Sequence, residues 1–329
     1  MPPKIDPNNV RIFSGRSNPA LAAGIASVLG VPLEETLVQH FANDCLGVQL
    51  CASVRGRTVY VVQSLTPPVQ ENLMELLMML DIARNAGASE VHAIIPYYAY
   101  ARSDKKDAPR ISIAARLVAD LLKTSGATQV MTMQLHTPQV HGFFSIPTDP
   151  LTARGLFVNH LRQQNHQPEE AVVVAPDAGI AKSAARLARL LGLSVAVGSK
   201  QRFSDTEVKI SRTIRKQVKG YKCAIIYDDE ISTGSSVVAL SRILLKSTIR
   251  CICVVSTHGL FTGQAIEHLN SIPQIEEIIV TDTVPPPSKK AFPKLTVLSV
   301  AETFGEAIRK NYHHESIGTL FTFWEEDEI

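Results

Sequence analysis

The sequence has little of what a membrane protein or a nucleic-acid-binding protein needs. Its 329 residues hold 33 Lys and Arg against 31 Asp and Glu, so the formal net charge is only +2. Such a balance provides no basic field for nucleic acid or for an anionic membrane. The apolar runs, such as residues 171–175 and 223–227, are as short as strands and far from the length of a membrane span. This composition argues against those partners and favours a small anionic substrate in a local site.

Cysteine is scarce and its number is odd. The five cysteines are Cys45, Cys51, Cys223, Cys251 and Cys253, in apolar or strand-like segments. Such a set is typical of reduced core thiols and not of a disulfide framework, which predicts the cytosol. Residues 1–13 have no apolar run behind their single Lys and predict neither a signal peptide nor a transit sequence. We expect a soluble, cytoplasmic protein.

The order of apolar runs predicts the fold class. Short β-branched runs alternate with amphipathic patterns, which predicts an α/β fold with helices on both faces of mainly parallel sheets. A length of 329 residues favours two units of about 150 residues each. The expected strands are 59–63, 91–95, 129–133, 171–175, 224–227, 252–256 and 277–281, and expected helices start at Pro67 and span 112–123. The Pro-rich stretch 145–155, followed by a polar one, places the domain boundary there.

The strongest chemical signal is residues 222–240, KCAIIYDDEISTGSSVVAL. An apolar strand leads into Asp228 and Asp229, then into a turn and a helix. The turn consists of Ser232, Thr233, Gly234, Ser235 and Ser236. The N–H groups of such a turn and helix start hold a phosphate, and hydroxyl groups add donors. The carboxylates would repel a phosphate but suit sugar hydroxyls or a bridging Mg²⁺. The segment predicts a sugar-phosphate site; the simpler alternative is a turn preceded by solvated acids.

This segment resembles the phosphoribosyl pyrophosphate motif of type I phosphoribosyltransferases and of ribose-phosphate diphosphokinases. Further matches to the diphosphokinases are FSGRSNP at 13–19, NLMELL at 72–77, ARSDKK at 101–106, LHTPQVHGFF at 135–144, APDAG at 175–179 and THGLFTG at 257–263. They cover nearly the full chain. The sequence is therefore similar to the ribose-phosphate diphosphokinase family.

The resemblance implies two tandem domains of the type I phosphoribosyltransferase fold. Residues 8–155 would form the ATP side, completed by the tail 311–325, and residues 156–310 the ribose 5-phosphate side. It further implies Mg²⁺ as the cofactor, ATP and ribose 5-phosphate as ligands, and hexamers built from dimers.

A basic segment, residues 101–110, lies between an expected strand and helix. It suits a polyphosphate, although a solvated charge run explains the same residues. The resemblance assigns Arg102 to the nucleotide, with Ser103 and Asp104 beside it. Ser103 departs from the Gln that is more usual there, which changes a hydrogen bond available to the nucleotide.

A second nucleotide segment, residues 40–46, departs further from the family pattern. Phe41 remains available to stack on adenine. Asn43, Asp44 and Cys45 replace an acid-Gly-acid string that would hold the base, so the preference for adenine is left open.

Two residues after expected strands are candidate metal ligands. His136 matches a family histidine that helps to bind the Mg²⁺ of MgATP, and Asp177 matches a metal-associated carboxylate. On the residues alone, a structural histidine is the more common explanation for His136, and a simple turn aspartate explains Asp177. Gln134 stands where the family often has Asp, which removes negative charge near the metal.

The segment 198–205, GSKQRFSD, carries Lys200 and Arg202 on what we expect to be a polar loop. Two cations on such a loop could neutralise charge on a transferring phosphoryl group, whereas a basic hairpin tip is the plain alternative. By resemblance to the family's catalytic loop, they become the catalytic candidates.

Together these features predict transfer of pyrophosphate from MgATP to the anomeric hydroxyl of ribose 5-phosphate, giving phosphoribosyl pyrophosphate and AMP. Two alternatives stay open. One is a non-catalytic regulatory partner of an active diphosphokinase. The other is a phosphoribosyltransferase, which would leave the ATP-loop matches unexplained.

Overall fold

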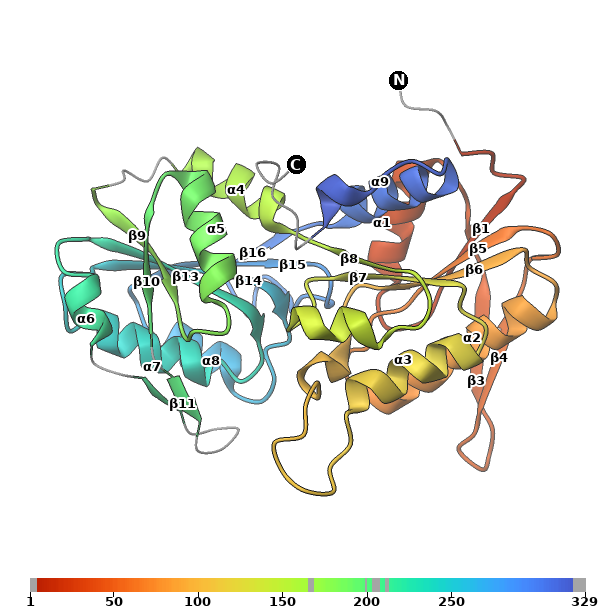
Figure 1. The fold of residues 1–329 in the computed structure, drawn as a ribbon, viewed down its shortest axis with the longest axis horizontal. Coiled ribbons are helices and arrows are strands. Elements are labelled where there is room, and N and C mark those ends of the chain that lie inside the picture. The colour runs from red at the N-terminus through yellow and green to blue at the C-terminus, as the bar shows by residue number, and fades with distance from the viewer. Residues whose placement is uncertain (1–4, 165–168, 199, 203–207, 211–212, 322–329) are drawn as a thin grey trace. The chain divides into compact units, whose positions relative to one another are not determined.

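The computed structural model describes residues 5–164, 169–198, 200–202, 208–210 and 213–321 (Figure 1). The chain divides into two compact units. The first is Met1–Thr152 with Thr283–Pro285 and Ser299–Ile329, and the second is Ala153–Asp282 with Pro286–Leu298. Within the described ranges, no helix is long and apolar enough to cross a membrane.

The first unit is built on a six-stranded parallel sheet in the order β2-β1-β5-β6-β7-β8. Its strands are β1 (Val10–Ser14), β2 (Leu33–Glu34), β5 (Thr58–Val62), β6 (Glu90–Ile95), β7 (Gln129–Met133) and β8 (Thr148–Leu151). An antiparallel hairpin of β3 (Thr36–His40) and β4 (Leu46–Leu50) follows β2. Strands β5 to β7 are almost entirely buried because helices cover both faces of a parallel sheet.

The helical elements of this unit are α1 (Pro19–Leu29), α2 (Val69–Asn85), η1 (Ala99–Arg102), α3 (Ala114–Thr124), η2 (Pro138–Phe143), α9 (Ala301–Tyr312) and η3 (Gly318–Leu320). Figure 1 shows α1 and α9 on one side of the sheet and α2 and α3 on the other. The sequence explains α1 well: the Asn18 side chain accepts from Leu21 N–H, Pro19 opens the helix, and Gly30 ends it at a φ of 66°.

The second unit has a six-stranded parallel sheet in the order β10-β9-β13-β14-β15-β16. Its strands are β9 (Ala171–Ala175), β10 (Ser194–Val197), β13 (Cys223–Ile231), β14 (Cys251–Gly259), β15 (Ile275–Thr281) and β16 (Leu295–Leu298), with an antiparallel hairpin of β11 (Lys200–Arg202) and β12 (Val208–Ile210). Its helices are α4 (Arg154–Gln163), α5 (Ala181–Leu191), α6 (Ile214–Gln217), α7 (Ser235–Leu244) and α8 (Ala265–Asn270).

The two units share one topology. In each, the chain leaves the first strand toward one edge, forms a two-stranded hairpin, and returns to pair the next long strand with the first. Each sheet therefore has a switch point where the strand order reverses, between β1 and β5 and between β9 and β13. Ligands of open α/β sheets bind outside the carboxyl ends of the strands at such a point.

The expected α/β class with two sheets flanked by helices is confirmed, and some segments differ in extent. The strand expected at 224–227 continues to Ile231, because β14 pairs with it as far as Gly259. Asp228 and Asp229 therefore lie on the strand. The tail that joins the first unit begins at Ser299, earlier than the 311 expected, because α9 packs on α1: a Cβ on Gly305 would lie 2.5 Å from Val28.

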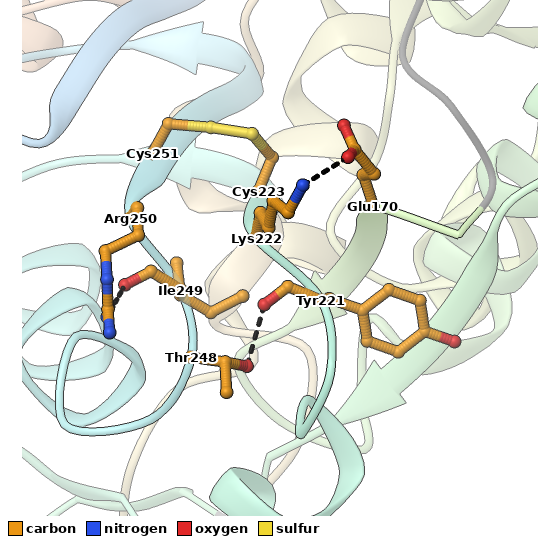
Figure 2. Close-up of a disulfide and its surroundings, with 8 residues drawn as sticks. All are labelled: Glu170, Tyr221, Lys222, Cys223, Thr248, Ile249, Arg250 and Cys251. Carbon is orange, nitrogen blue, oxygen red and sulfur yellow. Dashed lines mark hydrogen bonds and ion pairs between the residues drawn. A yellow bond between two sulfur atoms is a disulfide. The ribbon is translucent and has the colours of Figure 1, made fainter.

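The expectation of five reduced thiols is wrong. Cys223 and Cys251 form a disulfide with a Cα–Cα distance of 4.7 Å, and Cys45 and Cys51 are exposed thiols. Cys253 is a buried thiol, as expected. The cause is register, since Cys223 stands directly opposite Cys251 at the first position of two neighbouring strands (Figure 2). Spacing along the chain does not reveal that pairing.

A series of polar side chains joins α9 to the sheet of the first unit. The Tyr60 hydroxyl donates to Asn311 Oδ1 at 3.0 Å, and Asn311 Nδ2 donates to Gln129 Oε1 at 2.8 Å. Gln129 Nε2 donates to the carboxylate of Asp149, which is 7% exposed. These bonds fasten the returning tail to β5, β7 and β8.

Asp149→Asn is expected to stabilise the protein at neutral pH. Burial raises the pKa of Asp149, and the hydrogen bond from Gln129 opposes this only in part. The raised pKa means that the protonated Asp149 carboxyl favours the folded state. This contribution to the free energy of unfolding is fully present below the ordinary pKa of 3.8, and it is lost as the pH rises through the pKa of Asp149 in the folded protein. Asparagine stays neutral and still accepts from Gln129. Urea unfolding should give the variant the larger free energy of unfolding at pH 7, with a smaller difference at pH 4. A less stable variant at pH 7 would contradict this.

Candidate active site

The sugar-phosphate segment lies where β13 ends and α7 begins. Gly234 has a φ of 72°, a left-handed conformation that glycine adopts without cost, and leads directly into α7. The Thr233 and Ser235 hydroxyls lie 2.9 Å apart, and Ser232 and Ser236 flank them, partly exposed. Hydroxyl groups and the first N–H groups of α7 thus gather at one turn. This is an arrangement that binds a phosphate.

The turn is supported by residues 257–263. Thr262 N–H donates to the Ser232 carbonyl at 3.0 Å, and the two hydroxyls lie 3.1 Å apart. Phe261 N–H donates to the Ile231 carbonyl at 3.1 Å. The THGLFTG segment therefore holds the phosphate turn in place.

The two carboxylates occupy consecutive positions of β13. Asp228 is half-buried and Asp229 is 6% exposed, and Asp229 N–H donates to Asp228 Oδ1 at 3.0 Å. Consecutive strand residues point to opposite faces of a sheet. The two carboxylates therefore do not form one symmetric pair, and Asp228 is the more exposed of the two. Burial raises the pKa of Tyr227, the residue before these two carboxylates, to about 12, so the Tyr227 hydroxyl stays neutral at physiological pH.

Asp177 follows β9, the strand beside β13, so its turn borders the same switch point. Its Oδ1 accepts from Gly179 N–H at 2.9 Å and from Ile180 N–H at 3.4 Å. One carboxylate oxygen therefore shapes the turn before α5.

The switch point of the first unit is filled by its own side chains. Gln63 Oε1 accepts from Ser17 N–H at 3.1 Å and from its hydroxyl at 2.6 Å. A Cβ on Gly15 would lie 2.3 Å from that oxygen, so any larger residue there would displace the Gln63 amide from its bonds to Ser17. Arg16 donates from its N–H and its Nε to the fully buried Glu75, at 2.7 and 2.8 Å. Side chains of the FSGRSNP and NLMELL segments thus occupy the switch point of the first unit and bond to one another there. At the switch point of the second unit, the β13–α7 turn instead presents hydroxyl groups.

The β3–β4 hairpin carries Phe41 and Asn43 at its tip. Asn43 Oδ1 accepts from Cys45 N–H at 3.2 Å, so this side chain builds the turn. The Phe41 side chain is 51% exposed and lies over Gly47, where an added Cβ would be 2.9 Å from the ring. It borders a hollow of about 580 Å³ along the hairpin. A half-exposed ring beside a hollow is suited to stacking on a base.

The hairpin is tied to α2 through Glu71. The carboxylate lies 3.1 Å from His40 Nε2 and accepts from Arg16 at 2.6 Å. The hydrogen bond from Arg16, followed by that from His40, holds the pKa of Glu71 below its usual value. Glu71 therefore stays ionised at neutral pH and anchors the base of the hairpin.

Arg102 is the last residue of η1, and Ser103 and Asp104 follow it, at the edge where β6 ends. Arg102 is exposed. The Ser103 hydroxyl donates to the Ser112 carbonyl and accepts from Ala114 N–H, both at 3.1 Å. A hydroxyl has a single proton to donate. Ser103 therefore closes the base of the loop before α3 and has no proton left for a phosphate.

His136 lies three residues beyond the end of β7 and is exposed, while Gln134 before it is 4% exposed and has a φ of 45°. His136 belongs to the first unit and Asp177 to the second. Lys200 and Arg202 lie on β11, paired with Ile210 and Val208, and not on a loop; their side chains lie outside the described part of the chain.

Residues 10–126 match the model of the N-terminal domain of ribose phosphate pyrophosphokinase, and residues 204–322 match that of the phosphoribosyl synthetase-associated domain. A Streptomyces coelicolor protein, provisionally named a ribose-phosphate pyrophosphokinase, is 49% identical and covers 95% of this chain and 98% of its own. The ribose-phosphate pyrophosphokinase of Deinococcus radiodurans is 45% identical over 94% of this chain and 97% of its own. The chain belongs to the ribose-phosphate pyrophosphokinase family.

A solved member of this family has the same fold. The crystal structure of phosphoribosylpyrophosphate synthetase from Mycobacterium smegmatis superposes with a TM-score of 0.85 at 36% identity, over 93% of this chain and 99% of that one. The family resemblance drawn from the motifs is thereby confirmed.

In this pyrophosphokinase-family chain, the supporting roles of two residues were not predicted from the sequence. Thr262 supports the phosphate turn, and Thr137 donates a hydrogen bond to Asp104. Both lie inside segments that the sequence singled out. No signal in the residues themselves marked them, because their partners are 30 and 33 positions away.

Proposed function

We propose that this chain is a ribose-phosphate diphosphokinase that makes phosphoribosyl pyrophosphate and AMP from MgATP and ribose 5-phosphate. The observation that carries the proposal is the β13–α7 segment, where carboxylates and a hydroxyl-rich turn lie together at the switch point of the second unit. The names of the full-length relatives support it.

In this proposal the phosphate of ribose 5-phosphate sits on Thr233 to Ser236, supported by Ser232. Asp228 and Asp229 accept hydrogen bonds from sugar hydroxyls. The adenine ring stacks on Phe41 beside Asn43, and Arg102 with the loop from Ser103 and Asp104 faces the polyphosphate.

The residues present fit a magnesium ion that arrives with ATP. Within the described ranges, no group of three or more His, Cys, Asp or Glu side chains could hold a metal on its own. Mg²⁺ usually binds through one or two carboxylates, water and substrate phosphates, so few protein ligands suffice. We assign His136 of the first unit and Asp177 of the second to magnesium binding, each within its own unit. When bound, the ion neutralises charge on the transferred group.

The transfer itself needs positioning more than reactive side chains. The anomeric oxygen forms a bond to the β-phosphorus of ATP, the bond to the α-phosphate oxygen breaks, and AMP leaves with that oxygen. The hydroxyl proton passes to solvent. Lys200 and Arg202 stabilise the charge between the reacting oxygens.

The test is AMP release by the purified protein from MgATP, with and without ribose 5-phosphate. Sugar-dependent AMP together with phosphoribosyl pyrophosphate would support the proposal. No AMP across phosphate concentrations and nucleotide donors, in a protein that co-assembles with an active diphosphokinase, would favour a regulatory partner instead. Consumption of phosphoribosyl pyrophosphate with a nucleobase, without ATP, would identify a phosphoribosyltransferase.

We extend the proposal to the assembly and cellular place of the protein: homo-oligomers, hexamers by family likeness, working in the cytoplasm in nucleotide biosynthesis. Light scattering of the purified protein measures the first point. A fully active monomer would contradict the proposed homo-oligomer.

A further inference from the structure

Two turns at the same edge of the first sheet are joined by one side-chain hydrogen bond. Thr137 Oγ1 donates to Asp104 Oδ2 at 2.7 Å, across 33 positions of the chain. Both side chains are half-buried. A hydrogen bond to a carboxylate is shorter and stronger than one between neutral groups.

The bond connects the two groups of residues that the proposed function assigns to MgATP. Strands β6 and β7 are parallel neighbours, so the segments that follow them leave the sheet at one edge. Asp104 is two residues after Arg102, and Thr137 is next to His136. The bond therefore links the turn that follows Arg102 to the turn that carries the exposed His136.

The remainder of the nucleotide loop is anchored differently. The Ser103 hydroxyl bonds to Ser112 and Ala114, and Ser103 O accepts from Ala115 N–H at 3.2 Å, so these bonds fix the loop to its own helix α3. Lys105 and Lys106 beyond Asp104 are exposed. Thr137 thus supplies a tie of another kind, from this loop to the neighbouring turn.

We propose that Thr137 is a positioning residue for MgATP. By holding Asp104 it sets the nucleotide loop against the turn that carries His136, without touching the reacting atoms. This inference rests on the proposed function only in that it takes MgATP as the ligand of this edge.

The test compares Thr137→Val, which removes the hydroxyl at nearly constant volume, with Thr137→Ser, which keeps it. Thr137→Val should raise KM for MgATP about tenfold, the equivalent of one lost hydrogen bond to a charged group, and leave KM for ribose 5-phosphate within about twofold. Thr137→Ser should restore the wild-type KM. Thr124→Val is the matched control, because it removes a hydroxyl that bonds only to Asp120 O on the surface of α3.

Two readouts do not depend on turnover. The Kd of MgATP, measured by calorimetry without ribose 5-phosphate, should weaken by the same factor. Trypsin should cleave after Lys105 and Lys106 several times faster in Thr137→Val than in wild type, because the loop has lost a tie. In an Asp104→Ala background, Thr137→Val should add nothing, since the acceptor is already gone.

The outcomes separate this inference from the proposed function. MgATP binding without sugar-dependent AMP would overturn the proposed function, and the ratio of Kd values would still decide on Thr137. Equal Kd and equal cleavage in Thr137→Val and wild type would overturn the positioning role. A wild-type protein that binds no MgATP would overturn both.

Discussion

Lys200→Ala should lower the rate of sugar-dependent AMP release by about 10²- to 10³-fold, the typical loss when one group that stabilises transition-state charge is removed. Lys200 lies on β11, in the hairpin that follows β10. The equivalent hairpin of the first unit, β3–β4, carries the proposed adenine contact at its tip. Both hairpins stand at the same place in the repeated topology, and each follows the second strand of its sheet. This correspondence supports a substrate-facing role for Lys200.

The effect should fall on kcat and leave KM nearly unchanged, because the charge that Lys200 meets develops only as the phosphoryl group moves. Arg202→Ala should behave likewise, and the double variant should lose less than the product of the two factors, since the residues act on the same charge. Lys219→Ala, an exposed lysine of the same unit, is the matched control. A Lys200→Ala enzyme that keeps its kcat and loses only affinity for ribose 5-phosphate would refute the catalytic assignment.

How far the sequence predicted the fold depended on the kind of pattern. The strands at 129–133 and 171–175 have the observed bounds. Residues 171–175 form an uninterrupted apolar run, which is what a strand covered on both faces requires. The end of β13 was predicted too early. Asp228 and Asp229 look like a loop in a hydropathy pattern, but the hydrogen bonds of β14 extend the strand beyond them. Polar residues that serve a site break the local pattern.

The candidate site was predicted as a set of segments and not as a set of contacts. Residues 232–236 are contiguous, so the turn that they form could be predicted from the sequence. The role of Ser103 was not, because its hydroxyl partners, Ser112 and Ala114, are reached only after the loop has folded back. Asn43 likewise forms its bond within the hairpin tip. Such roles depend on backbone geometry that residue types do not specify.

The largest expected effect on stability comes from the disulfide. Breaking it should lower the free energy of unfolding by about 3.6 kcal/mol in the chain-entropy estimate for a loop of this size. The bond joins residues 28 positions apart, and the unfolded chain gains the freedom of that loop once it opens. Urea unfolding with and without a thiol reductant measures the difference. The paired variant Cys223→Val with Cys251→Val should match the reduced protein, because valine suits a strand and isolates the loss of the cross-link.

Thiol counting gives an independent check. In denaturant, the oxidised chain should show three thiols, those of Cys45, Cys51 and Cys253, and five after reduction. Burial raises the pKa of Cys253, so this thiol is a poor nucleophile for exchange with the nearby bond. Cys45→Ser removes an exposed thiol and should leave stability unchanged. Five thiols in protein purified without reductant would show that the bond does not form.

The disulfide should not affect substrate binding. It lies at the start of β13, and Asp228 is five positions along the same strand, roughly 16 Å away at the usual rise per residue. Figure 2 shows the bond beside the ion pair of Lys222 with Glu170. The disulfide lies where β13 begins, whereas the phosphate turn follows the residue where β13 ends. KM for ribose 5-phosphate should therefore be equal in oxidised and reduced protein. A reducing compartment would keep these thiols apart, and the protein would then work with a lower stability and an unaltered site. If reduction instead raised that KM, the start of β13 would have to influence the turn at its end.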